Sequence, residues 1–103
     1  MKTIPILAAA LLAASAHAGV LEVKVQGLNC SLCSEQMRDS LRTAAQASDI
    51  EPKLECGVIF LQTEQSAEQA EATLRWPLMS NGFNLTSVEH SSRSMDAARE
   101  LKC

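Results

Sequence analysis

Four cysteines are the residues of this sequence whose chemistry is most specific. Cys30 and Cys33 stand three positions apart in the stretch GLNCSLC, and Cys56 and Cys103 follow singly. Two sulfurs on a short loop can bind a soft metal ion, exchange disulfides, or form a small structural disulfide. The structural role would add little stability, because so short a loop removes little entropy from the unfolded chain. We therefore expect Cys30 and Cys33 to have a chemical purpose.

The segments on either side of this pair indicate a strand followed by a helix. Apolar and polar residues alternate along residues 21–26, which predicts a strand with one solvent-facing side, and Gly27 ends it. Residues 34–48 then carry apolar residues at helical spacing. At a helix start, free N–H groups and the helix dipole favour a thiolate over a thiol. A thiolate is both the better metal ligand and the better nucleophile, so the position suits either role.

The remaining segments complete an α+β fold. Further strands are expected at residues 50–54, 58–61 and 83–88, and a second helix opens at the capping box of Ser66 and is kinked or ended by Pro77. The order strand, helix, strand, strand, helix, strand predicts a ferredoxin-like βαββαβ sandwich, with both helices on one face of a four-stranded antiparallel sheet. The predicted strand order is fourth, first, third, second. It places Pro52, which cannot donate a ladder hydrogen bond, on an edge strand.

The two ends of the chain are expected to lie outside a single domain at residues 19–90. Residues 1–18 combine Lys2, an apolar run and the small-residue site Ala16-His17-Ala18, a pattern typical of a signal peptide that is cut before Gly19. The run is shorter than the roughly 20 apolar residues that span a bilayer. We therefore expect an exported, periplasmic protein that is not embedded in the membrane. Residues 91–103 are expected to form a C-terminal tail with a short helix.

Cys56 and Cys103 are a candidate disulfide. An even number of cysteines in an exported chain usually means disulfides. In the predicted topology the hairpin with Cys56 emerges at the same end of the sheet as Cys30 and Cys33, and a tail helix capped by Ser94 is long enough to reach that end. Two alternatives stay open. One or both thiols join Cys30 and Cys33 as metal ligands, or they remain unpaired or intermolecular.

Composition narrows the choice of partners and ions. The net charge is −3 and no basic cluster occurs, which argues against nucleic acid and anionic membrane surfaces. We expect a monomer. Two sulfurs suit a soft ion of low coordination number, such as Cu(I) or Hg(II), whereas structural zinc normally takes four ligands. Met37, Met79 and Met95 are expected to fill the core.

The stretch GLNCSLC, the aromatic Phe83 after Asn81-Gly82 and the strand order resemble the heavy-metal-associated domains. That family includes copper chaperones, the amino-terminal domains of copper-exporting ATPases and periplasmic mercury-binding proteins. Its usual loop is GMTCxxC, so that Leu28 replaces the methionine and Asn29 the threonine. The resemblance covers roughly residues 20–89, which is most of the chain after the predicted signal peptide.

The resemblance implies a role for each matching residue. Cys30 and Cys33 would be the metal ligands, Leu28 would anchor the loop in the interior, and Phe83 would pack beside it. One Cu(I) or Hg(II) ion would be captured and passed, by exchange of thiolates, to a membrane metal transporter or another metal carrier. Such a protein is a binding module and not an enzyme.

Two other functions remain. A periplasmic thiol–disulfide exchange protein would use the same pair, but such proteins usually carry an aromatic residue before the first cysteine, where this chain has Asn29. They also need a proline opposite the pair, and Pro77 is predicted in or after a helix. The other possibility is a ferredoxin-like domain with no role in metal binding.

Overall fold

The protein is described by a computed structural model that covers residues 19–27 and 29–103. The predicted signal peptide at residues 1–18 and the predicted anchor Leu28 lie outside the described residues. The elements in chain order are β1 (Gly19–Gln26), the 3₁₀ turn η1 (Cys30–Cys33), α2 (Glu35–Ala44), β2 (Ala47–Lys53), the 3₁₀ turn η2 (Leu54–Cys56), β3 (Val58–Thr63), α3 (Ala67–Met79), β4 (Asn84–Ser91) and α4 (Met95–Glu100). Within the described ranges, no helix combines the length and hydropathy needed to cross a membrane.

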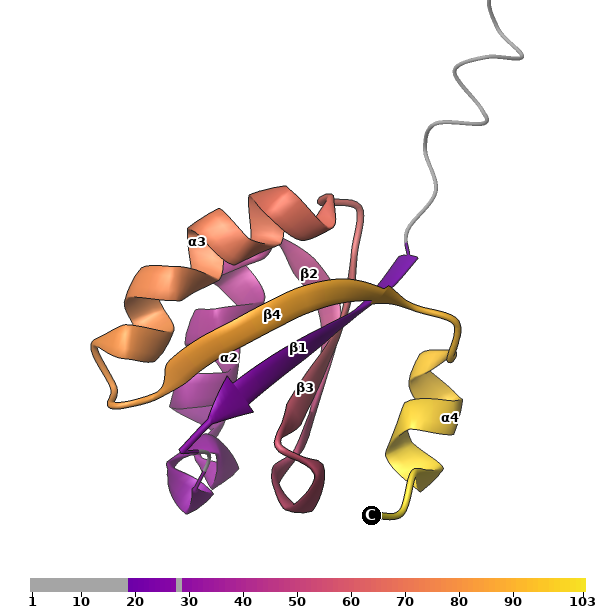
Figure 1. Cartoon of the computed structure of the whole chain (residues 1–103), viewed down its shortest axis with the longest axis horizontal. Coiled ribbons are helices and arrows are strands. Elements are labelled where there is room, and N and C mark those ends of the chain that lie inside the picture. The colour runs from indigo at the N-terminus through magenta and orange to yellow at the C-terminus, as the bar shows by residue number, and fades with distance from the viewer. Residues whose placement is uncertain (1–18, 28) are drawn as a thin grey trace, which may run out of the picture.

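The four strands form one antiparallel sheet in the order β2-β3-β1-β4. Helices α2 and α3 cover one face of this sheet, and α4 lies on the other (Figure 1). The α+β, ferredoxin-like βαββαβ prediction is confirmed, with its strand order and the short tail helix. Pro52 lies in β2 at the edge, where a missing backbone N–H disrupts no interior ladder.

The larger core lies between the sheet and helices α2 and α3. Strands β1 and β3 point alternate side chains into it, as the alternation along residues 21–26 predicts. The helices meet them with a stripe of apolar residues at helical spacing. The most buried members of this core are Leu21, Val23, Leu32, Leu41, Ala45, Ile59, Leu61, Ala70, Leu74, Leu78 and Phe83.

The opposite face of the sheet is closed by the tail. Val58 and Phe60 of β3 point to this side and pack with Met95 and Ala98 of α4, and Phe60 is fully buried. Ser94 caps α4 by accepting a hydrogen bond from the Ala97 N–H at 3.1 Å. The unbroken apolar run of β3 is therefore explained by a strand that is buried on both faces.

Polar contacts hold α4 against the edge strand β2. The Arg99 guanidinium forms ion pairs with Asp49, Glu51 and Asp96, and the Lys53 ammonium donates a hydrogen bond to the Arg99 carbonyl at 2.6 Å. The hydrogen bond and the charge of Asp49 raise the pKa of Arg99 above its ordinary value. Arg99 and Asp96 are exposed and the partners on β2 are only half-buried, so these contacts fix the direction in which α4 runs more than they add stability.

Several element boundaries differ from the prediction, and three of these differences are the largest. The helix expected over residues 34–48 ends at Ala44, because Gln46 adopts a positive φ of 51° and the chain turns into β2. Strand β2 begins earlier than expected. Strand β4 continues past Val88 to Ser91, since its polar second half pairs with β1 as far as Val20.

Pro77 does not end α3, although the sequence predicts that it kinks or ends this helix near Trp76. The helix reaches Met79, and Leu78 is completely buried, so core packing outweighs the one hydrogen bond that the proline removes. The turn that follows the helix ends at Gly82, whose φ is 88°, and the Phe83 N–H donates a hydrogen bond to the Leu78 carbonyl at 3.0 Å.

Cys103 is joined to Cys56 by a disulfide, with a Cα–Cα distance of 5.4 Å and a sequence separation of 47. Replacing both by serine should lower the free energy of unfolding by about 4 kcal/mol, because the unfolded chain regains the entropy of a long loop. Urea denaturation measures this difference. The matched control is the double variant Cys30→Ser/Cys33→Ser, whose loop spans a separation of only 3 and should cost less than half as much. Equal losses in the two variants would contradict the prediction.

Candidate functional site

The candidate site lies at one end of the sheet. Because β1 and β2 run in the same direction, the turn η1 after β1 and the turn η2 after β2 emerge together. The C-terminus, with Cys103, is brought to this end by α4 (Figure 1). All four cysteines therefore lie at the same end of the molecule, as two separate disulfides.

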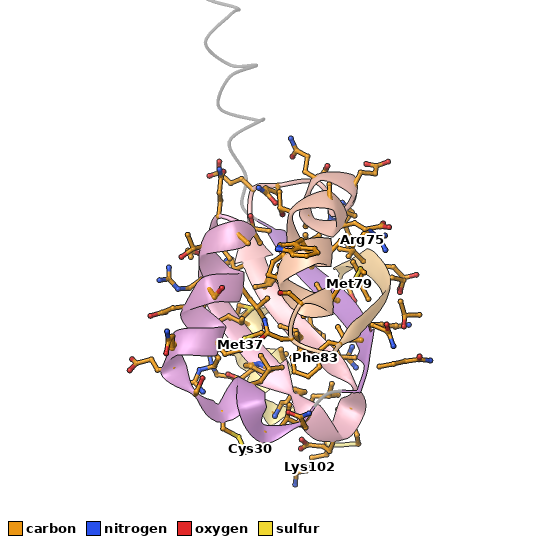
Figure 2. The ribbon with its side chains drawn as sticks, turned by 90° about the vertical axis from the view of Figure 1, so that its left-hand side faces the viewer. Cys30, Met37, Arg75, Met79, Phe83 and Lys102 are labelled. Atoms are coloured by element: carbon orange, nitrogen blue, oxygen red, sulfur yellow. A yellow bond between two sulfur atoms is a disulfide. The ribbon has the colours of Figure 1, made fainter. Side chains whose placement is uncertain are left out.

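Cys30 and Cys33 occupy the first and last positions of η1, directly before α2. Their side chains are exposed, their Cα atoms are 4.9 Å apart, and their sulfurs form a disulfide. Ser34 is the N-cap of α2 and accepts a hydrogen bond from the Met37 N–H at 3.1 Å. The sulfurs are thus placed beside the positive end of the α2 dipole, where a reduced pair would be stabilised as thiolate. Figure 2 shows Cys30 at the outer tip of this end.

Leu32 fixes the turn to the protein interior. It lies between the two cysteines in sequence, is only 1% exposed, and belongs to the core under α2 and α3 together with Phe83. The 3₁₀ geometry makes this possible, because residues of so tight a turn point in different directions. Sequence reasoning did not identify Leu32. Its signal is a lone large apolar residue within an otherwise polar CSLC turn.

Arg38 ties the same turn to α2. Its Nη1 donates to the carbonyl of Leu32 at 3.1 Å and to the carbonyl of Cys33 at 2.8 Å. These two carbonyls precede the helix and accept no hydrogen bond from its backbone. The Arg38 side chain therefore supplies the donor that they need. The guanidinium also brings a positive charge next to Cys33. This residue was not a sequence candidate, because an arginine on the polar side of a helix carries no distinctive pattern.

The start of the loop packs against the turn before β4. Gly27 has a φ of 87°, and a Cβ built on it would lie 3.5 Å from the Gly82 carbonyl oxygen. A larger residue at Gly27 would be strained by the positive φ. This approach places Phe83, which is 1% exposed, near the base of the loop and in the same core as Leu32.

The histidine and methionine side chains of the described residues, which could also bind a metal ion, do not gather at the pair. Within the described residues, no group of three or more His, Cys, Asp or Glu side chains could hold a metal ion together. His90 is exposed and pairs with Leu21, toward the far end of the sheet. Met95 is buried and Met37 packs on the core, but Met79 is 52% exposed, so the expectation that it fills the core is wrong. Met79 lies on the outward side of the last turn of α3, away from the core.

Known proteins provide little further guidance. No family model matches this sequence, and no curated protein matches it. Among solved structures, the chain is similar to the "Solution structure of the N-terminal domain of ZntA in the apo-form", with 16% sequence identity and a TM-score of 0.49, over 74% of this chain and 96% of that one. A similarity of this extent says nothing about the ion or the partner.

Proposed function

We propose that this protein is an exported soft-metal carrier that captures one Cu(I) or Hg(II) ion between Cys30 and Cys33. The observation that supports it best is the placement of two exposed sulfurs on one turn, at the positive end of α2, with Leu32 and Arg38 holding the turn in place. The proposed periplasmic location rests on the sequence of residues 1–18.

The number of donors favours a soft ion of low coordination number. Two thiolates can form a linear or bent two-coordinate complex, which Cu(I) and Hg(II) accept and zinc normally does not. The disulfide between Cys30 and Cys33 must first take up two electrons, because a thiolate is the metal ligand. The reduced pair then binds the ion without further ligands from the described residues.

Exposure of both sulfurs suits transfer of the ion to a partner. An incoming thiolate from a membrane metal transporter or another metal carrier would bind the ion as one of the two cysteines leaves. The ion passes between the proteins without ever being free, and no covalent bond of a substrate is broken. The protein would act as a binding module and not as an enzyme, and as a monomer.

One observation favours thiol–disulfide exchange as a second candidate. Pro52 of β2 and Cys33 line the same surface hollow, so a proline does lie beside the pair, although it is not Pro77. A proline opposite the cysteine pair is what the exchange function was expected to need, and Pro52 is the proline that shares a hollow with Cys33. Asn29 still occupies the place where those proteins usually carry an aromatic residue.

Replacing either Cys30 or Cys33 by serine should weaken binding of one Cu(I) or Hg(II) by at least about 100-fold, since a single thiolate leaves too few soft donors. Native mass spectrometry of the reduced protein, with a competing chelator, measures this. The matched control is Cys56→Ser/Cys103→Ser, in which the only thiols are Cys30 and Cys33 and one ion should still bind. Tight 1:1 binding by Cys30→Ser would show that the ligand assignment is wrong.

The protein should also be a poor catalyst of insulin reduction by dithiothreitol. A carrier turns over no disulfide substrate, and Asn29 offers no aromatic surface for one. We expect turbidity to develop at least about tenfold more slowly than with an equal concentration of thioredoxin. A comparable rate would favour the exchange function over the carrier function.

A further inference from the structure

A surface hollow of about 360 Å³ lies beside Cys33, between η1, the start of α2 and the edge strand β2. Cys33 and Arg38 line one side of it, and Ile50, Glu51, Pro52 and Leu54 line the other. Its volume lies near the lower end of the range of small-molecule sites, about 300–1,000 Å³. Cys30 is not among its lining residues. We call this feature the Cys33 hollow.

The Cys33 hollow is lined by one cation, Arg38, and one anion, Glu51. Glu51 forms an ion pair with Arg99 of α4 at 3.4 Å, which Arg99 shares with its pairs to Asp49 and Asp96, so Arg38 is the charged wall residue that can bind an anion. Arg38 is half-buried and has no ion pair within the described part of the chain, and its two hydrogen bonds to backbone carbonyls use only Nη1. The Nε and Nη2 donors therefore remain for an anionic ligand, which guanidinium groups bind well through a carboxylate.

We propose that the Cys33 hollow binds a small thiol that carries a carboxylate, and that this thiol reduces the Cys30–Cys33 disulfide by attacking the sulfur of Cys33. The carboxylate would contact Arg38, and the carbon chain would lie against the apolar wall of Ile50, Pro52 and Leu54. A thiol bound in this hollow would lie next to Cys33, which lines it, and not next to Cys30, which does not, and thiol–disulfide exchange depends on which sulfur the attacking thiolate can reach. The proposal goes beyond ion transport, since it holds whether or not an ion is later bound.

The small thiol reduces the Cys30–Cys33 disulfide in two exchange steps. The thiolate of the small molecule forms a bond to Sγ of Cys33 while the Cys33–Cys30 sulfur bond breaks, and the electron pair leaves with Cys30 as a thiolate. A second small thiolate attacks the small-molecule sulfur of this mixed disulfide and expels Cys33 as a thiolate beside the α2 N-terminus. Two small thiols are oxidised to one small disulfide, and the protein disulfide is reduced by the same two electrons.

Reduction rates of the oxidised mature protein with three thiols of similar size test the proposal. The thiols are 3-mercaptopropionate (anionic), 2-mercaptoethanol (neutral) and cysteamine (cationic), and each rate constant is expressed per concentration of thiolate. We expect the anionic thiol to be up to about fivefold faster than the neutral one at low salt, as one exposed ion pair allows, and the cationic thiol to be slowest. Added NaCl should reduce the preference by screening.

Substitutions assign the preference to one side chain. Arg38→Gln should reduce the anionic-to-neutral ratio to within about twofold of unity, and Arg38→Lys should keep a preference because it keeps the charge. Arg75→Gln is the matched control: it removes the same charge from an exposed Glu71 pair on α3, far from Cys30 in Figure 2, and should leave the ratio unchanged. A general loosening of the turn would speed all three thiols equally, so the ratio is the informative quantity.

Tandem mass spectrometry of alkylated peptides locates the adduct after a brief exposure to limiting 3-mercaptopropionate. The proposal expects the mixed disulfide on Cys33, with Cys30 alkylated. It is overturned by equal rates for the three thiols, by a preference that Arg38→Gln retains, or by an adduct found mainly on Cys30. None of these readings requires a metal ion, so the proposal can fail while the carrier function stands, or hold while that function fails.

Discussion

The fold depends on covering β3 from both sides. Val58 and Phe60 point to one face of the sheet, and Ile59 and Leu61 point to the other, and all four are buried. Helices α2 and α3 cover one face, as a βαββαβ arrangement provides. Without α4 the ring of Phe60 would be exposed to water, and the folded state would lose about 1.5–3 kcal/mol of hydrophobic free energy. The tail must therefore cross the sheet, and in crossing it carries Cys103 to the end where Cys56 lies.

Rigidity at the candidate site comes from the same core. Leu32 is buried with Phe83 while the cysteines on either side of it are exposed, so the turn is anchored by packing and leaves its sulfurs accessible. Arg38 then holds the backbone of the turn through two carbonyls. Two sulfurs held in this way lose little conformational freedom when they take up an ion or a new disulfide partner.

The sequence predicts the architecture well because its main signals are local. These signals involve only a few neighbouring residues: the alternation along β1, the capping box at Ser66, and Pro52, which requires an edge strand. The features that the sequence did not predict depend on tertiary contacts. Burial of Leu78 carries α3 through Pro77, and neither the role of Leu32 nor the hollow beside Cys33 can be inferred before the turn and β2 are placed side by side. The predicted topology allowed a disulfide between Cys56 and Cys103, but it also allowed these thiols to bind a metal ion or to remain unpaired or intermolecular.

The two disulfides differ in what their opening would do to the fold. The Cys30–Cys33 bridge spans a separation of 3, so the unfolded chain gains little from its reduction, and Leu32 and Arg38 continue to hold the turn. The Cys56–Cys103 bridge spans 47 residues and secures the helix that covers Phe60. Reduction of the first therefore changes the chemistry of one end of the molecule with small structural consequences, whereas reduction of the second removes a constraint on the sheet itself. A reductant directed to Cys33 would exploit this difference, because it could release two thiolates while the longer bridge keeps the fold intact.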